Sequence, residues 1–320
     1  IRIAALRTRS MEYFLGFDGG GTKTECVLMD SQGKILAETR SGPSNPLRSG
    51  FERSFDSLGS AAAAALSSRQ LPENCVTGVC AGIAGAGRTD VVERVAEFLR
   101  RKFSGATVRV TTDLEIALET AAGAEAGLVL VAGTGSAAFG RNARGRTARA
   151  GGEGPQIGDL GSAFDIGRHA WNLMVSSEPE SARSRQSVLT DRIYQALGST
   201  DSDSIARRIS KNPDDIFPRL FPPVVSAAEL GDSSSRKILL EAAGALSKLA
   251  SAVVIELGME SESFILAEVG GVFGKSTYLD SEVNAQLARI APKSRIVQLK
   301  ISPARGAAEM ARRAAGRKIT

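Results

Sequence analysis

The chain has 320 residues and a mass of 33.5 kDa, which is enough for two domains of ordinary size. Its hydrophobic fraction of 42% and charged fraction of 23% are typical of a soluble globular protein. The formal net charge is +5, but residues 1–10 carry three arginines and no acid, so the remainder carries 5 − 3 = +2. No basic stripe with interleaved aromatic residues occurs, and nucleic acid is therefore not an expected partner.

The N-terminal residues and the cysteines give little information on function. Residues 1–10 precede Met11, which would begin the first strand, so we interpret them as an extension ahead of that methionine or as residues added to the natural chain. No apolar segment of 7–15 residues follows the arginines, which disfavours a targeting peptide. The cysteines, Cys26, Cys75 and Cys80, lack metal-site spacing and are expected to be reduced thiols in strands of a cytoplasmic protein. No run of about 18 apolar residues occurs, so no membrane span is expected.

Apolar runs, glycine-rich turns and prolines predict the elements in chain order. In the first half, strands are expected at 13–18, 23–30, 34–40, 75–81 and 106–112. Helices are expected there at about 51–69, 89–102 and 114–123. The same plan restarts near residue 124, with strands at 127–132, 136–141, 146–151, 264–269 and 295–299 and helices at 162–174, 277–289 and 304–316. A helical stretch at about 186–257 is interrupted by prolines. Strands before helices in each half predict two mixed α/β domains with a cleft between them.

The first glycine-rich turn, residues 18–24, reads Asp-Gly-Gly-Gly-Thr-Lys-Thr and follows an apolar run. It is close to a P-loop, but Thr22 separates the last glycine from Lys23, and the residues that follow alternate as in a strand. Consecutive glycines still allow backbone N–H groups to approach phosphate oxygens. Lys23 adds positive charge, and Thr22 and Thr24 add hydroxyl donors. These features favour a phosphate site over a plain hairpin turn. Asp18 could hold Mg²⁺ through water. The predicted phosphate ligands are Gly19, Gly20, Gly21, Thr22 and Lys23.

A second glycine-rich turn, residues 132–136, occupies the matching place in the second half and reads Ala-Gly-Thr-Gly-Ser. It fits a dinucleotide-binding pattern, with an acidic residue twenty positions later. Against that alternative, Gly140 and Gly145 would end the required helix within two turns, and the plan of 13–34 is repeated here. Two such hairpins facing one another could hold a polyphosphate from both sides, which predicts an ATP-using enzyme. The predicted ligands are Gly133, Thr134, Gly135 and Ser136.

Single polar residues are candidates for the reaction. Asp113 ends a strand at the carboxyl edge of the predicted sheet, where it could accept the proton of a substrate hydroxyl or cap the next helix. Asp159 is open to the same two interpretations, a role in the reaction or a structural role at the start of the next helix. Asn45, on the loop after the third strand, is a plausible sugar contact or a turn residue. His169 is the only histidine and is expected to be a packed or surface residue, so tight zinc binding is not expected.

Together these residues resemble the actin-like ATPase and sugar-kinase superfamily over about 11–313, and more narrowly its N-acetylglucosamine kinase branch, which is grouped with activator ATPases of the benzoyl-CoA reductase type. The two turns correspond to the phosphate motifs of the family and Asp113 to its catalytic aspartate. Gly270 and Gly271 correspond to its adenosine-side glycine pair. The resemblance implies two ribonuclease H-like domains, 11–122 completed by the helix 304–316, and 123–303 with a helical insertion at about 186–257.

The resemblance further implies a cytoplasmic kinase that uses ATP and Mg²⁺ to phosphorylate the 6-hydroxyl of N-acetylglucosamine or glucosamine. The acceptor would lie near Asn45, Asp113, Gly152 and Asp159. Two family patterns differ here: Gly-Gly-Trp-Gly reads Gly-Gly-Glu-Gly at 151–154, and Gly-Asp-Glu-Gly-Ser reads Gly-Asp-Leu-Gly-Ser at 158–162. Glu153 replaces the tryptophan, and we weigh two interpretations: it pairs with the free amine of glucosamine, or it is a solvated loop residue.

Two other functions remain open at this stage. An activator ATPase would hold an iron–sulfur cluster between two subunits through cysteines, and no such spacing is present. A non-catalytic sugar sensor is the second alternative, although no helix-turn-helix pattern precedes the first strand. A homodimer is possible from the resemblance, and no nucleic-acid or membrane partner is expected. The sequence leaves open the choice among N-acetylglucosamine, glucosamine and N-acetylmuramic acid, and the nucleotide preference.

Overall fold

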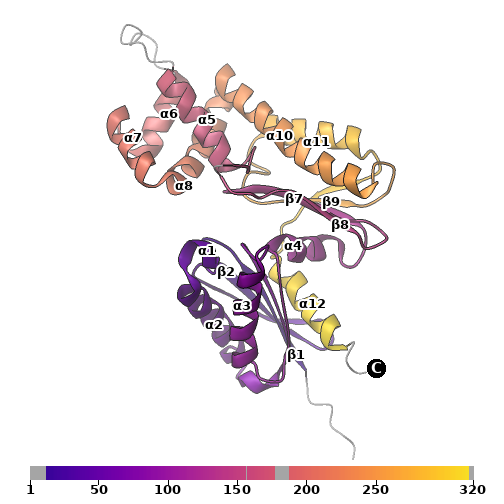
Figure 1. The fold of residues 1–320 in the computed structure, drawn as a ribbon. Coiled ribbons are helices and arrows are strands. Elements are labelled where there is room, and N and C mark those ends of the chain that lie inside the picture. Colours follow the sequence, from indigo (N-terminus) through magenta and orange to yellow (C-terminus); the bar gives the residue numbers. More distant parts are fainter. Residues whose placement is uncertain (1–11, 156, 177–186, 317–320) are drawn as a thin grey trace, which may run out of the picture. The chain divides into compact units, whose positions relative to one another are not determined.

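The computed structural model describes residues 12–155, 157–176 and 187–316 (Figure 1). The interpretation of residues 1–10 lies outside the described residues. The chain divides into two compact units. Unit 1 comprises Ile1–Gly123 with Ile301–Thr320, and unit 2 comprises Ala124–Lys300. The last helix of the chain therefore returns to the N-terminal unit.

Unit 1 is built on a five-stranded sheet with the order β3-β2-β1-β4-β5. The strands are β1 (Tyr13–Gly19), β2 (Thr24–Asp30), β3 (Ile35–Ser41), β4 (Val76–Ile83) and β5 (Thr107–Thr111). β1, β2 and β3 pair antiparallel, while β1, β4 and β5 pair parallel. The helical segments are α1 (Pro46–Ser49), α2 (Phe51–Ser67), η1 (Glu73–Cys75), α3 (Thr89–Lys102), α4 (Asp113–Ala122) and α12 (Ala304–Gly316).

The two faces of this sheet carry different hydrophobic cores, because successive side chains of a strand point to opposite faces. Leu15 and Phe17 of β1 belong to the core shared with α2 and α3. Phe14 belongs to the core shared with α12 and with Ile116 of α4. At Gly16 an added Cβ would lie 2.1 Å from the backbone nitrogen of Ala308, so glycine is required for α12 to pack directly against β1.

Unit 2 repeats the same sheet plan, with the order β10-β9-β6-β7-β8. The strands are β6 (Gly127–Ala132), β7 (Ser136–Arg141), β8 (Thr147–Gly151), β9 (Ile265–Val269) and β10 (Arg295–Gln298). β6, β7 and β8 pair antiparallel, and β6, β9 and β10 pair parallel, as do their counterparts in unit 1. This equivalence of order and direction shows that the repeat in the sequence is a repeat of the fold, and it confirms the predicted α/β class.

The helices of unit 2 form most of its single large core. They are α5 (Ala163–Ser176), α6 (Val188–Leu197), α7 (Ser202–Lys211), α8 (Pro213–Ile216), η2 (Phe217–Leu220), α9 (Phe221–Glu229), α10 (Ser233–Leu257) and α11 (Thr277–Ile290). α10 lies along the sheet and beside α11 (Figure 1). By length and composition alone α10 could cross a membrane, but half of its apolar window is buried inside unit 2, and core helices of soluble proteins pass the same test.

Candidate nucleotide and acceptor site

The first glycine-rich turn joins β1 to β2 and is closed by a hydrogen bond from the Gly20 nitrogen to the Lys23 oxygen, 2.9 Å long. Gly19 is buried, and an added Cβ would lie 2.3 Å from Ser44 Oγ and 2.6 Å from Ile83 Cδ1. Glycine at this position is therefore required by packing. Gly20 and Gly21 lie toward the surface, where their backbone can approach a ligand.

The loop after β3 is tied to this turn through the Gly20 oxygen, which accepts hydrogen bonds of 3.0 Å from the nitrogens of both Ser44 and Asn45. The hydroxyl of Thr24 donates to the Gly42 oxygen at 2.7 Å, so it serves the fold. Asn45 caps α1, its Oδ1 accepting a 3.0 Å hydrogen bond from the Leu47 nitrogen. Asn45 thus has a structural role as a helix cap, where the weighed alternative was a turn residue, and its contact with a sugar stays a prediction.

The short helix α1 brings a cation to the glycine turn that the sequence analysis did not single out. An added Cβ at Gly21 would lie 3.2 Å from both Cδ and a terminal nitrogen of Arg48, so the arginine side chain covers this part of the turn. Arg48 is exposed. The Asn45-Pro46 pair is a helix-start signal, since asparagine caps and proline favours the first helical position, and it could have located α1.

The predicted phosphate ligand Lys23 is bound to a carboxylate in this structure. Its ammonium lies 2.5 Å from Glu25 Oε1, and the lysine side chain is 49% exposed. Arg40 reaches the same oxygen at 2.6 Å, and the Ser302 hydroxyl donates to Glu25 Oε2 at 2.5 Å. Burial acts to raise the pKa of Glu25, but these hydrogen bonds outweigh it and hold the pKa below its usual range. Glu25 is therefore a firmly ionised group beside the turn.

Asp18 and Asp113 come together at the carboxyl edge of the parallel strands of unit 1. Asp18 pairs with Gly82 of β4, and Gly82 pairs with Thr111 of β5, two residues before Asp113. Gly82 contributes no side chain between the two acids. Burial is the largest cause that raises the pKa of Asp18 to about 7, and the negative charge of Asp113 is the next.

The environment of Asp18 fits a divalent cation. Besides Asp113, Glu25 also raises the pKa of Asp18, and Lys23 is the group that lowers it. A bound cation would relieve this crowding of negative charge and keep Asp18 ionised. No group of three or more His, Cys, Asp or Glu residues suited to a metal occurs among the described residues.

The cap of α4 is Thr112, so the prediction that Asp113 itself caps this helix is wrong. Thr112 has extended backbone geometry, and its hydroxyl accepts a 3.2 Å hydrogen bond from the Glu115 nitrogen. Asp113 is the first helical residue, and its Oδ1 lies 3.1 Å from the Leu114 nitrogen. It sits at the positive end of the helix dipole, which favours its ionised form.

In unit 2 the second glycine turn connects β6 to β7 and contacts Gly270 of the predicted adenosine-side pair. The Gly133 nitrogen donates to the Gly135 oxygen at 2.9 Å, and the Val272 nitrogen to the Ala132 oxygen at 3.0 Å. Gly270 has a φ of 110°, and an added Cβ there would lie 2.3 Å from the Ala132 oxygen. The structure thus brings two segments more than 130 positions apart to one place, and Gly270 must be glycine on both conformational and packing grounds.

The loop after β8 folds over the same turn and carries Asp159. An added Cβ at Gly135 would lie 2.7 Å from Asp159 Oδ2, so the carboxylate lies directly beside the glycine turn. The Ser136 hydroxyl donates to the Leu160 oxygen at 2.8 Å and holds the loop in place. Asp159 is buried and has a φ of 53°, which is uncommon for a residue other than glycine. Such geometry is often found at functional sites.

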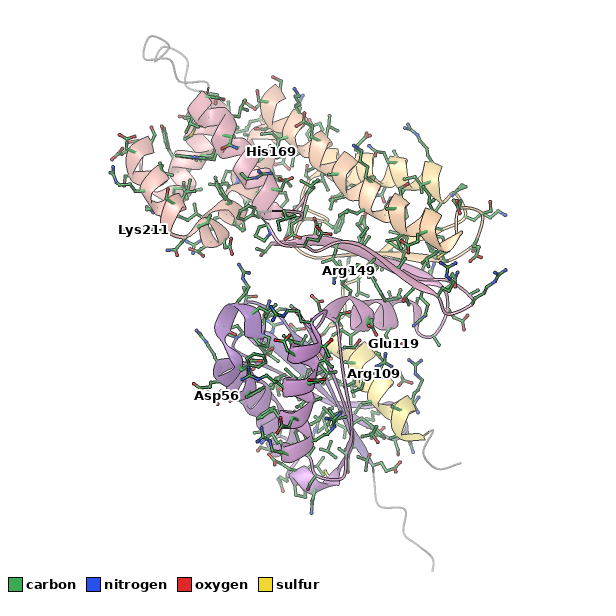
Figure 2. The ribbon with its side chains drawn as sticks, in the orientation of Figure 1. Asp56, Arg109, Glu119, Arg149, His169 and Lys211 are labelled. Atoms are coloured by element: carbon green, nitrogen blue, oxygen red, sulfur yellow. The ribbon has the colours of Figure 1, made fainter. Side chains whose placement is uncertain are left out.

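The part of this loop that differs from the family pattern is solvent-accessible. The Gly152 nitrogen donates to the Ser136 oxygen at 2.9 Å, and the Gly152 oxygen accepts a 2.8 Å hydrogen bond from Arg149, whose position Figure 2 shows. Glu153 is exposed.

His169, on α5 (Figure 2), lies on the surface of unit 2 as expected. Its side chain is nearly half exposed, and its Nδ1 lies 3.6 Å from Asp165 Oδ1.

The cysteines lie in unit 1. Cys26 and Cys80 are buried in β2 and β4, and burial raises the pKa of both thiols, that of Cys80 to about 12. Thiols with such pKa values are poor nucleophiles and metal ligands at neutral pH.

Two units with one sheet plan, each with a glycine-rich turn after its first strand, define the class of actin-like ATPases, which includes sugar kinases. The chain belongs to the BadF/BadG/BcrA/BcrD ATPase family, whose model matches residues 15–311. The chain is 33% identical over 305 residues to an N-acetylmuramic acid/N-acetylglucosamine kinase of Clostridium acetobutylicum, covering 94% of this chain and 99% of the relative. It is 30% identical to an N-acetyl-D-glucosamine kinase of Dictyostelium discoideum, covering 94% and 98%. A crystal structure of a candidate N-acetylglucosamine kinase from Chromobacterium violaceum superposes with a TM-score of 0.74 at 26% identity, covering 94% and 99%.

Proposed function

We propose that the protein is an ATP-dependent kinase that phosphorylates an amino sugar, N-acetylglucosamine or glucosamine, on its 6-hydroxyl. The observation that carries this proposal is the glycine-rich turn at the same place in both repeats, together with Asp113 beside Asp18 at the carboxyl edge of the sheet of unit 1. The names of the two full-length relatives support an amino-sugar acceptor. The family supports the use of ATP.

Both glycine turns are proposed to bind phosphate groups of ATP. In unit 1 the backbone of Gly20 and Gly21 and the side chains of Thr22 and Lys23 would contribute, next to the close-packed Gly19. In unit 2 the contribution would come from residues 133–136, with Gly270 and Gly271 on the adenosine side. Mg²⁺, when bound near Asp18, supplies positive charge that offsets the charge of the phosphates.

Asp113 is proposed as the general base. Its carboxylate would accept the proton of the sugar hydroxyl while the sugar oxygen bonds to the γ-phosphorus and the bond from phosphorus to the ADP oxygen breaks. Asp18 takes a different role because the two acids have different surroundings. The pKa of Asp18 is raised mainly by burial, whereas Asp113 stands at the start of α4, where the helix dipole favours a carboxylate.

The acceptor is proposed to contact Asn45, Asp113, Gly152, Glu153 and Asp159. The position of Asp159 beside Gly135 supports an additional role on the phosphate side, where it would orient the turn or a hydrated cation. We further propose that the protein acts in the cytoplasm, where ATP is available, and that it forms a homodimer.

A coupled ADP-release assay across amino sugars tests the proposal. N-acetylglucosamine, glucosamine and N-acetylmuramic acid would each be offered with ATP and Mg²⁺, and the phosphorylated carbon of the product would be found from phosphorus–proton correlations in NMR. We expect sugar-dependent ADP release and a 6-phosphate product. Sugar binding without ADP release would instead indicate a sensor, and sugar-independent hydrolysis by a brown, cluster-bearing dimer would indicate an activator ATPase.

A further inference from the structure

Glu25 joins the phosphate turn of unit 1 to the segment by which the chain returns to that unit. Its Oε1 accepts hydrogen bonds from Lys23 at 2.5 Å and Arg40 at 2.6 Å, and its Oε2 accepts one from Ser302 at 2.5 Å. We propose that Glu25 is a positioning residue that holds Lys23 away from phosphate until nucleotide binds, and that couples this exchange to the return segment at Ser302. The proposal rests on the proposed function, in which Lys23 binds phosphate.

The burial of the partners shows which of them is able to move. The side chain of Glu25 is only 11% exposed, whereas those of Lys23 and Arg40 are 49% and 68% exposed. The carboxylate is therefore fixed by its surroundings, and the two cations approach it from solvent. Lys23 lies in the turn itself, where its ammonium group can bind either the Glu25 carboxylate or a phosphate oxygen.

Ser302 stands at the point where the chain enters unit 1 for the second time. The two units divide between Lys300 and Ile301. The Ser302 hydroxyl also accepts a 3.3 Å hydrogen bond from the Ala304 nitrogen at the start of α12, while the neighbouring Pro303 oxygen accepts one of 3.2 Å from Thr120. The Glu25–Ser302 hydrogen bond therefore helps to fix the first turn of α12, which packs on β1.

The Lys23 ammonium group can pair with the Glu25 carboxylate or with a phosphate of the nucleotide. When Lys23 binds phosphate, Glu25 loses a charged partner and depends more on Arg40 and Ser302. A hydrogen bond to a carboxylate strengthens as competing donors leave, so the bond to Ser302 should tighten. Occupancy of the turn is thus transmitted to the start of α12 through a single carboxylate.

The Glu25→Gln variant tests this coupling because it should affect binding and turnover in opposite directions. Without the negative charge, Lys23 is free for phosphate, and we expect calorimetry to show ATP binding about two- to fivefold tighter, the usual effect of one exposed ion pair. The weakened anchor at Ser302 should lower kcat. Ser302→Ala should lower kcat without tightening ATP binding, since Lys23 keeps its partner.

Glu38→Gln is the matched control. Glu38 pairs with Arg305 at 2.7 Å and so also links a strand of unit 1 to α12, but it does not touch Lys23. We expect this variant to keep the ATP affinity and kcat of the wild type. Glu25→Gln with unchanged or weaker ATP binding, or the same tightening in Glu38→Gln, would overturn the proposal.

Hydrogen exchange gives a readout that does not need the sugar reaction. Adding ATP with Mg²⁺ to the wild type should slow amide exchange at residues 302–306, and this slowing should be absent in Glu25→Gln. If the wild type phosphorylates an amino sugar but shows no such slowing, the coupling fails while the kinase function stands. If no sugar is phosphorylated, the proposed kinase function is wrong. The coupling between Lys23 and Ser302 is then still tested by the ATP affinity of the variants and by amide exchange at residues 302–306.

Discussion

Asp18 near the end of β1 lies in the electrostatic field of Asp113 at the start of α4, and both residues stand at the carboxyl edge of the parallel strands of unit 1. Burial first, and the charge of Asp113 second, raises the pKa of Asp18 to about 7. The same closeness means that a cation bound near Asp18 would also affect Asp113. The protonation of Asp18 therefore depends on the charge of Asp113.

Replacing Asp113 should separate nucleotide binding from catalysis. We expect Asp113→Ala to retain ATP affinity within a few-fold but to lower kcat by about 10²- to 10⁴-fold, the usual contribution of a general base. ATP binding would be measured by calorimetry and turnover by coupled ADP release. Glu115→Gln is the matched control, because Glu115 lies in the same helical turn and pairs with Arg109 at 3.1 Å. Near-normal turnover in Asp113→Ala would contradict the base assignment.

Arg48 should add to phosphate affinity because it covers Gly21 of the turn. We expect Arg48→Ala to weaken ATP binding about two- to fivefold, the range of one exposed ion pair, with a smaller effect at high salt. Arg53→Ala, also an exposed arginine of unit 1 but on α2, should leave ATP binding unchanged. Equal effects of the two substitutions would show that Arg48 acts only through net charge.

Most of the fold could be predicted because its signals are local. The helix predicted at 89–102 is α3 with the same bounds, and the strands 127–132 and 136–141 are β6 and β7 without change. Prolines divided the helical stretch of unit 2 as expected: Pro213 begins α8, and α9 has a proline in its first turn. The predicted stretch did not show that six helical segments would result, since the ends of α6 and α10 depend on left-handed glycines at 198 and 258.

The site was less predictable because its contacts join distant parts of the sequence. The Lys23–Glu25 pair had a local signal, because two residues of opposite charge stand two positions apart, Lys23 directly before β2 and Glu25 within it. Ser302, which completes that group, lies 277 positions away and had none. Asp159 was expected near the acceptor, but its position beside Gly135 depends on how the loop after β8 closes over the turn.

Glu153 should influence the choice of acceptor if its exposed carboxylate meets the free amine of glucosamine. We expect Glu153→Trp to lower kcat/KM for glucosamine relative to N-acetylglucosamine by about two- to fivefold, the range of an exposed ion pair. The measurement is kcat/KM for both sugars in both proteins. Glu153→Gln separates charge from shape, because it keeps the size of the side chain and removes only the charge. An unchanged ratio in both variants would leave Glu153 as a solvated loop residue.

Glu268 should make the stability of unit 2 depend on pH. It is 6% exposed on β9, and its Oε1 has no hydrogen-bond partner. Burial first, and the charge of Asp280 second, raises its pKa to about 7. The folded state therefore binds this proton more tightly than the unfolded state, so the free energy of unfolding falls as pH rises from about 4.5 to 7. A shift of this size corresponds to on the order of 3 kcal/mol.

Glu268→Gln removes this ionisation while keeping the shape of the side chain. Urea unfolding followed by tryptophan fluorescence reports on the same unit, because the single tryptophan, Trp171, is buried in the core of unit 2. We expect the variant to gain stability relative to the wild type on going from pH 4 to pH 8, whereas Glu260→Gln, which changes an exposed acid of unit 2, should follow the wild type. Parallel pH profiles for Glu268→Gln and the wild type would mean that the carboxyl of Glu268 ionises as readily in the folded protein as in the unfolded chain, and that burial beside Asp280 costs its charged form nothing.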